Sequence, residues 1–373
     1  MTHAANPSTA SLFPILPARL TGLPRMAAEA EHLGEGHLVE FRTLKVRSIL
    51  NRSISKRQPW LAYSINPYRG CEFGCRYCYA RYTHEFLAPS DAAENKSSHQ
   101  APDPIPLRDP EAFERIIFLK QNAAWLLEQD LKRVDPAQQI AIGTATDPYQ
   151  PIERKARITR TLLEVFARRQ GYRLGIVTKS ILIERDLDLL REIAARNILT
   201  VHITITTPDT QLARKLEPRA PRPDLRFAVV KQLRAAGIRT GILCCPLLPG
   251  ITDSELALDA MARLAAEAGA SFFAANPLFL KPCSRHTYFA FVRQHFPELM
   301  QDYESRFATA DFAAPAYARK LQLTVDRVSR RYGLKERLRD SSLATNSDFD
   351  DFAGAPRKSP QTTFPNPQQK LFA

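Results

Sequence analysis

Short apolar runs alternate with longer segments of helical spacing along the middle of the chain. The runs of strand length cover residues 62–66, 139–143, 174–178, 199–206, 240–245 and 270–276. Between them, apolar residues recur every three or four positions, as in Ile158, Leu162, Val165 and Phe166. This spacing predicts helices over residues 158–169, 183–195, 225–236 and 254–268.

Strands that alternate with helices are typical of parallel βαβ units. The pattern gives about six units, fewer than a complete (β/α) barrel contains. It fits a partial barrel and an open doubly wound sheet equally well. In both α/β architectures, ligands bind at the carboxyl ends of the strands.

The flanking segments differ in character from this core. Residues 1–40 have little periodicity and predict a mostly irregular N-terminal arm, and residues 41–283 would form the core domain. Residues 284–340 read as a C-terminal helical extension, because helical patterns at 289–295, 299–307 and 317–332 have no strands between them. Residues 88–108 predict a flexible insertion, and residues 341–373 a disordered tail.

The chain is strongly basic, with a formal net charge of +13 over its 373 residues. Such a charge attracts polyanions, including nucleic acid, but an arginine-rich solvated surface explains it equally well. No apolar run approaches the length of a membrane span, and the N-terminus lacks the pattern of a secretory signal. We therefore expect a soluble cytoplasmic protein with no membrane partner.

Three of the six cysteines lie within eight residues, at Cys71, Cys75 and Cys78. A disulfide framework spreads its cysteines through a short secreted chain, so this crowding indicates metal or redox chemistry. Three thiolates at this spacing can hold three corners of a [4Fe–4S] cubane and leave one iron open. Gly70 and Gly74 are expected to relieve crowding where the backbone approaches the cluster sulfurs.

The alternative for this cysteine cluster is a structural zinc site. Structural zinc requires four cysteine or histidine ligands, and His84 is the nearest additional candidate. In that case the protein would be a non-catalytic metal-binding protein.

The motif C-x3-C-x-aromatic-C, matched by Cys71, Cys75, Tyr77 and Cys78, resembles the signature of the radical S-adenosylmethionine (radical SAM) superfamily. The resemblance implies a partial (β/α)6 barrel. It also implies a [4Fe–4S] cluster that binds S-adenosylmethionine and cleaves it to a 5′-deoxyadenosyl radical, which abstracts hydrogen from a substrate. An external electron donor of the flavodoxin or ferredoxin type is implied as well. Tyr77 would lie against the adenine, with simple packing as its alternative role.

Polar residues at the predicted strand ends are the candidates for further cofactor contacts. The superfamily resemblance implies that the loop after the second strand meets the amino group of the cofactor, and its candidates are Thr144, Thr146 and Asp147. Glu153 in the same segment suits the N-terminus of the following helix instead. Lys179 closes the third strand and would meet a carboxylate or a substrate anion, or simply solvent.

The fourth strand and its loop supply the remaining candidates. Thr204 and Thr206 can hydrogen-bond a ribose, although threonine is also a common strand former. Glu217 and Arg219 lie in a proline-rich loop, where they would either shape the pocket or form an ordinary surface ion pair.

Within the superfamily, the segment 60–280 resembles the spore photoproduct lyase branch. Tyr79, the Thr-Asp-Pro stretch after the second strand and Thr-Lys after the third carry that resemblance. The lyase returns a hydrogen atom from a cysteine just before the acid of the second-strand loop, where this chain has Thr144-Ala145-Thr146. Cys244, Cys245 or Cys283 would have to supply a thiol instead, and their alternative role is that of small buried hydrophobes.

Three functional hypotheses follow from these residues. The first is a radical SAM enzyme of the lyase-like branch, with DNA or a nucleotide as its substrate, which requires the base to be flipped or exposed. The second is a radical SAM enzyme that acts on a small molecule or a protein side chain. The third is the non-catalytic metal-binding protein.

Overall fold

The computed structural model describes residues 22–28, 30, 32–36, 39–53, 61–88 and 106–334. Its main element is a seven-stranded sheet with the order β11-β10-β9-β8-β7-β4-β3. Six of its strands are parallel: β4 (Leu61–Ile65), β7 (Gln139–Ile142), β8 (Arg173–Thr178), β9 (Ile198–Thr204), β10 (Arg239–Leu247) and β11 (Phe273–Pro277). The short β3 (Leu50–Arg52) pairs antiparallel with β4 at the edge.

The strand order decides between the two architectures that the sequence pattern left open. From β4 to β11 the strands of this sheet follow one another in chain order, without a reversal of direction; β5 and β6, between β4 and β7 in the chain, belong to a second sheet. A doubly wound sheet would reverse its order at a switch point, so this fold is the partial (β/α)6 barrel.

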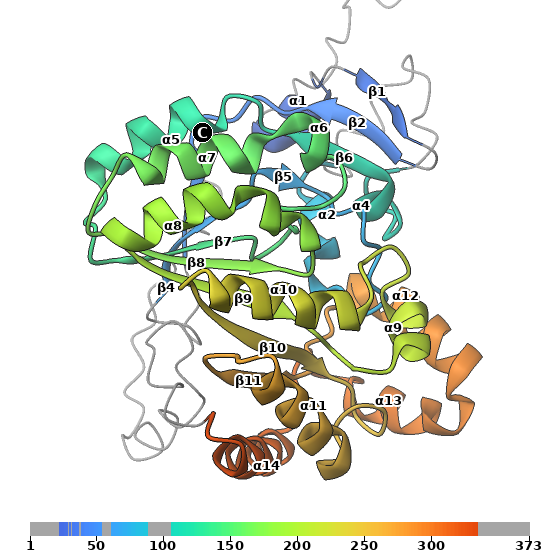
Figure 1. Cartoon of the computed structure of the whole chain (residues 1–373). Coiled ribbons are helices and arrows are strands. Elements are labelled where there is room, and N and C mark those ends of the chain that lie inside the picture. Colours follow the sequence, from blue (N-terminus) through green and yellow to red (C-terminus); the bar gives the residue numbers. More distant parts are fainter. Residues whose placement is uncertain are drawn as a thin grey trace, which may run out of the picture.

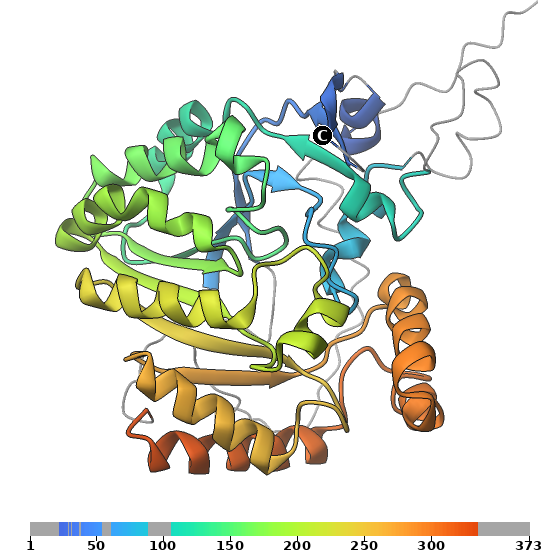
Figure 2. The ribbon, with the colours of Figure 1, turned by 45° about the vertical axis from the view of Figure 1, so that its right-hand side comes forward.

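Helices cover the outer side of this sheet in both views of the molecule (Figures 1 and 2). They are α5 (Ala123–Asp130), α7 (Ile158–Ala167), α8 (Leu187–Arg196), α10 (Pro223–Ala235) and α11 (Glu255–Glu267). Each buries one apolar face against the strands, as α7 does through Leu162, Val165 and Phe166. Burial of each large apolar side chain contributes about 1.5–3 kcal/mol.

A smaller four-stranded sheet, which the sequence pattern did not predict, adjoins the barrel. Its order is β1-β2-β6-β5, formed by β1 (His32–Gly36), β2 (Val39–Thr43), β6 (Ile116–Leu119) and β5 (Tyr68–Arg69). Part of the segment predicted as an irregular arm is therefore regular: α1 (Gly22–Ala28) is a helix, and β1 pairs antiparallel with β2. Residues 1–21, 29, 31, 37 and 38 lie outside the described residues, as do residues 89–105 of the predicted insertion, residues 335–340 and the predicted tail.

The C-terminal helices lie in two separate parts of the molecule, the outer helical layer and the carboxyl ends of the strands. The helix α14 (Pro315–Arg331) lies beside α11 and β11 and extends the outer layer (Figures 1 and 2). The helices α12 (Pro282–His295) and α13 (Met300–Arg306), with the short turn η4 (Pro297–Leu299), lie at the carboxyl ends of the strands. There α12 contacts the turn η1 (Tyr79–Arg81) that follows the cysteine cluster.

The remaining short elements connect these layers. They are α2 (Tyr82–Glu85), α4 (Ala112–Arg115), η2 (Leu131–Arg133), α6 (Glu153–Ala156), η3 (Ile181–Asp186) and α9 (Thr210–Leu216). Among the described residues, no helix has both the length and the apolar composition of a membrane-spanning segment.

Candidate active site

The three clustered cysteines lie on the loop that follows β4 and β5, at the carboxyl end of the sheet. A hydrogen bond to α4 anchors this loop, since Cys71 N–H donates to Phe113 O at 2.9 Å. Within it, Cys78 N–H donates to Cys75 O over 3.2 Å. None of the three thiols forms a disulfide. The fold therefore brings three free thiols to the end of the barrel where ligands bind.

Two glycines of this loop have left-handed backbone and close protein neighbours. Gly70 has φ +89°, and a Cβ there would lie 2.7 Å from Ile116 O. Gly74 has φ +61°, and a Cβ there would lie 2.5 Å from a nitrogen of Arg219. Both positions therefore favour glycine on the protein's own geometry, and room for cluster sulfurs stays a prediction.

The sulfur environments combine burial with nearby positive charge. Burial raises the pKa of Cys75 to about 12, and Lys179 opposes that shift. Burial also raises the pKa of Cys78, with Arg81 opposing, and the pKa of Cys71, whose sulfur accepts backbone N–H groups of Asp147 and Phe73. Thiols with pKa values raised in this way stay protonated until a bound metal ionises them, and cations placed around them then stabilise the thiolates.

The geometry argues against the zinc alternative. Among the described residues, no group of three or more Cys, His, Asp or Glu side chains is arranged to hold a single metal ion. His84 lies elsewhere, with Nε2 2.9 Å from Ile116 O and its ring against Phe113 and Phe118. Each cysteine ligand of a cubane binds its own iron, so the three sulfurs do not need to converge on one point. The donor set therefore fits an iron–sulfur cluster better than zinc.

The buried His84 predicts an acid-sensitive contribution to stability. Burial lowers its pKa from 6.5 to about 3, and Arg69 and Arg81 reinforce the shift. The unfolded chain then binds the extra proton below pH 6.5, so the stabilisation is complete above that pH and is lost as the pH falls. We expect about 2 kcal/mol to be lost between about pH 6.5 and 5.

Denaturant unfolding at those two pH values measures this effect. His84→Leu should flatten the dependence, and the same change at the exposed His286 should leave it as in the wild type. An unchanged dependence in His84→Leu would contradict the assignment.

A buried network fixes Tyr77 behind the cysteines. Its hydroxyl lies 3.0 Å from Thr206 Oγ1 and also donates to Glu217 Oε1. Glu217 forms an ion pair with Arg226 at 2.5 Å, and both side chains are at most 2% exposed. The Glu217–Arg226 pair therefore holds Tyr77 through its hydroxyl while its ring packs beside the cysteines.

Lys179 projects from the end of β8 into the same region. Its Nζ lies 5.7 Å from the centroid of the Tyr77 ring. Burial works to lower its pKa, but Cys75 and Glu217 raise it overall. The side chain thus remains a half-buried ammonium group facing the cysteine loop, which suits a carboxylate ligand.

The loop after β7 is tied down on both sides. Asp147 accepts from Thr178 Oγ1 at 2.6 Å and from Lys179 N–H at 2.7 Å, so its carboxylate fastens this loop to the end of β8. Although these bonds oppose it, burial raises the pKa of Asp147. On the other side, Asn66 Oδ1 accepts N–H groups of Ala145 and Thr146 at 2.9 and 3.4 Å.

Thr144 and Thr146 already form hydrogen bonds within the protein. Thr144 Oγ1 accepts from Asn66 Nδ2 at 3.4 Å, and Thr144 O accepts the Tyr79 hydroxyl. Thr146 Oγ1 donates to Tyr68 O at 3.5 Å. Glu153, the other acid of this segment, accepts Thr159 N–H at 2.9 Å and so caps α7, as the sequence suggested.

The fourth-strand candidates divide between the interior and the rim. Ile203 and Ile205 belong to the main core, so Thr204 between them faces the barrel interior. Thr206 lies just beyond β9 and joins the Tyr77 network. Arg219 approaches Glu114 at 3.4 Å and remains about one-third exposed, so it lies over the cysteine loop and not within the interior.

The two adjacent cysteines of β10 point in opposite directions. Cys244 packs in the main core, and its Sγ lies 3.5 Å from Thr206 O. Cys245 therefore faces the interior, where Asn276 Nδ2 lies 3.6 Å from its sulfur. The structure thus leaves Cys244 as a small buried hydrophobe and brings only Cys245 to the site. Cys283 lies at the start of α12 beside Ser284.

Sequence reasoning missed the residues that hold these groups. Arg81 donates to Cys75 O at 3.1 Å and pairs with Glu114 at 2.5 Å, a contact between distant segments with no sequence signal. Arg226 did leave a signal, because it occupies the same helical face as the buried Val229 and Leu233. A charged residue at such a core position indicates a buried partner.

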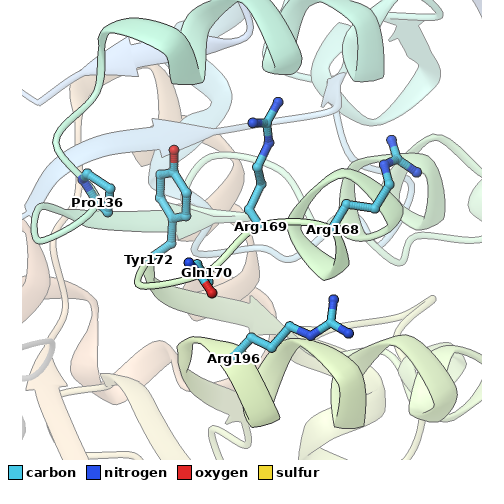
Figure 3. Close-up of a pocket in the computed structure, with 6 residues that line it drawn as sticks. All are labelled: Pro136, Arg168, Arg169, Gln170, Tyr172 and Arg196. Carbon is cyan, nitrogen blue, oxygen red and sulfur yellow. The ribbon is translucent and has the colours of Figure 1, made fainter.

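A separate hollow of about 400 Å³ lies at the opposite end of the strands (Figure 3). It is lined by Pro136, Arg168, Arg169, Gln170, Tyr172 and Arg196. These residues surround the start of β8, at the end of the barrel that does not carry the cysteine loop. The hollow is therefore not part of the candidate active site.

The comparisons with known proteins agree with this site. The sequence profile of the Radical SAM superfamily matches residues 65–262, more than half of the chain. The chain belongs to the radical SAM superfamily. Radical SAM enzymes use a [4Fe–4S] cluster and S-adenosylmethionine and need an electron donor. The family prediction from the cysteine motif is confirmed, and so is the partial barrel.

The sequence relatives of this radical SAM protein carry no assigned activity. Uncharacterized proteins of Mycobacterium bovis and Mycobacterium tuberculosis are 30% identical to it over 297 residues, which cover 79% of this chain and 82% of theirs. An uncharacterized protein of Methanocaldococcus jannaschii is 26% identical over 217 residues, 58% of this chain and 71% of that protein.

Solved structures with a similar fold include spore photoproduct lyase. A cysteine-to-serine variant of that enzyme has a TM-score of 0.55 and 18% identity, covering 79% of this chain and 80% of the lyase. A cysteine-to-alanine variant with dinucleoside spore photoproduct has a TM-score of 0.56 and 17% identity over the same shares. At this identity the likeness is one of fold.

Proposed function

We propose that this radical SAM enzyme abstracts a hydrogen atom from a nucleic acid or nucleotide substrate. The observation that carries the cofactor part is the loop with free Cys71, Cys75 and Cys78 at the carboxyl end of the barrel, faced by Lys179. The substrate part is supported by the basic charge of the chain and by its fold likeness to spore photoproduct lyase, which has been solved with a dinucleoside photoproduct.

In this proposal the three cysteines hold a [4Fe–4S] cluster, and S-adenosylmethionine binds beside it. When bound and reduced, this pair supplies a 5′-deoxyadenosyl radical. Lys179 provides the charge for the cofactor carboxylate, and Tyr77, positioned by Glu217, provides a rigid ring for the adenine. Thr144 and Thr146 are the candidates for the cofactor amino group, and their loop is already fastened in place by Asn66.

The remaining sequence candidates take supporting roles. Both carboxylate oxygens of Asp147 accept hydrogen bonds from residues at the end of β8. We therefore assign Asp147 to positioning Lys179, in addition to any direct contact with the cofactor. Thr204 and Thr206 are retained for the ribose, since Thr204 faces the interior and the buried Thr206 belongs to the Tyr77 network. Arg219 is assigned to the outer side of the cysteine loop, where an electron donor of the flavodoxin or ferredoxin type would approach.

Cys245 is the thiol that we propose for returning a hydrogen atom to the substrate radical. Burial raises its pKa to about 11, so it keeps its proton at neutral pH. In the transfer the S–H bond breaks homolytically and a C–H bond forms on the substrate. One electron from the external donor and one proton then restore the thiol. The protein excludes solvent while this happens, as radical chemistry requires.

Substrate choice is tested by 5′-deoxyadenosine formation. Reduced, anaerobically reconstituted enzyme is incubated with single-stranded, duplex and ultraviolet-damaged oligonucleotides and with short peptides. We expect one class of oligonucleotide to raise formation above the rate without substrate. Stimulation by peptides alone, or by none of the oligonucleotides, would contradict the nucleic acid assignment.

The role of Cys245 is tested by solvent deuterium. A thiol exchanges with D2O, so the wild-type product should gain one deuterium at the attacked carbon. Cys245→Ala should reduce product formation at least about tenfold and keep 5′-deoxyadenosine formation, because only the return step is lost. Cys244→Ala, next to it in the core, is the matched control. Full deuterium incorporation in Cys245→Ala would exclude the role.

A further inference from the structure

One buried side chain holds the backbone on both sides of Cys71. Gln150 lies in the loop after β7, and its side chain is fully buried. Its amide oxygen Oε1 accepts Glu72 N–H at 2.9 Å, and its amide nitrogen Nε2 donates to Gly70 O at 3.3 Å. The side chain therefore pairs with the residues directly before and after Cys71, as a backbone peptide group would.

An amide side chain suits these two backbone groups. Gly70 offers a carbonyl acceptor and Glu72 offers an N–H donor, so their shared partner must have one donor and one acceptor. An ionised carboxylate only accepts, an ammonium group only donates, and a methionine of similar size offers only a weak sulfur acceptor. Both groups belong to buried residues, where an unpaired backbone group costs free energy.

A second hydrogen bond connects the same two loops in the opposite direction. Glu72 Oε1 accepts Ile152 N–H at 2.7 Å, so the cysteine loop also holds the loop after β7. The side chains of Glu72 and Gln150 thus each bind the backbone of the other loop. The two loops form one interlocked unit next to Cys71.

A different element holds Cys78 at the other end of the cysteine loop. Ser284 Oγ donates to Cys78 O at 2.7 Å from the start of α12, and Ser284 is fully buried. Among the described residues, the side chain of Gln150 forms no hydrogen bond with this part of the loop. A change at Gln150 should therefore affect Cys71 and leave Cys78 in place.

The loop that carries Gln150 also carries candidates for cofactor binding. The threonines proposed for the cofactor amino group precede it, and Asp147 fastens the loop to Lys179 N–H at 2.7 Å. Gln150 therefore connects Cys71 to the groups proposed for the amino and carboxylate groups of S-adenosylmethionine. A cubane is rigid, so a shift at one of its cysteine corners would also displace its open iron.

We propose that Gln150 is a positioning residue, which fixes Cys71 relative to the loop that receives S-adenosylmethionine. It acts through the backbone next to Cys71 and not through a contact with the cofactor. The inference rests on the cluster part of the proposed function, because Cys71 needs this position as an iron ligand, and it is independent of the substrate. Removal of contacts that orient a metal ligand typically lowers metal affinity or activity about 10–100-fold.

The first measurement uses the full chain before reconstitution. Reduced protein is treated with iodoacetamide under native conditions, and mass spectrometry follows each cysteine separately. In Gln150→Met, Cys71 should react at least about fivefold faster than in the wild type, because the loop around it opens more easily. Cys78 and Cys244 should change less than about twofold, and Cys244, which lies in the main core, reports global unfolding.

The second measurement uses the reconstituted chain. Electron paramagnetic resonance follows the cluster signal of the reduced protein as S-adenosylmethionine is added. Gln150→Met should keep the cluster and weaken cofactor binding about tenfold, because the open iron no longer lies correctly against the cofactor loop. Glu72→Gln keeps an oxygen for Ile152 N–H, so it should retain cofactor binding within about twofold of the wild type.

Two matched variants separate positioning from general stability. Gln139→Met removes another buried glutamine, at the start of β7 and so at the opposite end of the barrel. It should leave the reactivity of Cys71 and the cofactor affinity within about twofold of the wild type. Ser284→Ala should have the reverse selectivity, with faster reaction of Cys78 and unchanged reaction of Cys71.

If Gln150→Met does not fold, Glu72→Ala, which removes the reciprocal hydrogen bond, is measured in the same two ways. Equal acceleration of Cys71, Cys78 and Cys244 would show general destabilisation and overturn the inference. Wild-type reactivity of Cys71, or a cluster that binds the cofactor normally in Gln150→Met, would overturn it as well. A wild-type chain that takes up no cluster would instead refute the cluster part of the proposed function.

Discussion

Cys75→Ala should reduce 5′-deoxyadenosine formation to the level without enzyme, and Cys71→Ala and Cys78→Ala should do the same. Each cysteine would hold a different iron, so loss of one thiolate leaves the cluster with too few protein ligands. The surrounding charges cannot compensate, because Lys179 and Arg81 only stabilise sulfur that is ionised. Iron content and 5′-deoxyadenosine are measured together after reconstitution.

The chain supplies its own controls for this experiment. Cys244 and Cys283 are free thiols outside the cysteine loop. Alanine at either position should leave iron content and cofactor cleavage within about twofold of the wild type. If a variant of the loop cysteines cleaved the cofactor normally, the assignment of that cysteine as a ligand would be wrong.

Glu217→Gln should lower the free energy of unfolding by about 3–5 kcal/mol. The change leaves Arg226 buried and without its counter-charge, which is the costly way to break a buried ion pair. Burial alone would raise the pKa of Glu217, yet Arg226 and Lys179 lower it overall, so the carboxylate is charged in the folded protein. Replacing both partners, as Glu217→Leu with Arg226→Met, should recover much of the loss.

Denaturant unfolding of the matched surface pair provides the comparison. Arg222 and Asp224 pair at 2.8 Å at the start of the same helix, α10, with side chains 64% and 52% exposed. Asp224→Asn should therefore change the free energy of unfolding by less than about 1 kcal/mol. If Glu217→Gln cost no more than Asp224→Asn, the buried pair would not stabilise the fold.

The same pair links stability to the site. Its carboxylate accepts the Tyr77 hydroxyl, so Glu217→Gln should also weaken binding of S-adenosylmethionine to the reconstituted enzyme if Tyr77 contacts the adenine. Unchanged cofactor affinity would separate Tyr77 from that role and leave the pair with a purely structural one.

The barrel could be predicted from the sequence because its signals are local. Apolar runs separated by helical spacing mark each βα unit, and α7 and α11 lie close to the predicted ranges. The smaller sheet could not be predicted in this way. It depends on pairing of β2 with β6, which is distant in sequence, and β5 has only two residues, too few for an alternating pattern.

The candidate site also contains residues that a local sequence pattern identifies and residues that only the structure reveals. The cysteine spacing is a local motif, so Cys71, Cys75 and Cys78 could be found directly. The residues that hold the cysteine loop in place come from distant segments, as in the ion pair of Arg81 with Glu114, and no local sequence pattern predicts such pairs. The difference between Cys244 and Cys245 also required the structure, because it depends on which face of β10 turns inward.

We expect Cys71, Cys75 and Cys78 to hold an iron–sulfur cubane whose open iron binds S-adenosylmethionine. Electron paramagnetic resonance of the reduced, reconstituted protein tests it most directly, with and without the cofactor. We expect about four irons per chain, no zinc, and a cluster signal that changes when S-adenosylmethionine is added. A chain that takes up zinc in place of iron, or a cluster signal that ignores the cofactor, would contradict it.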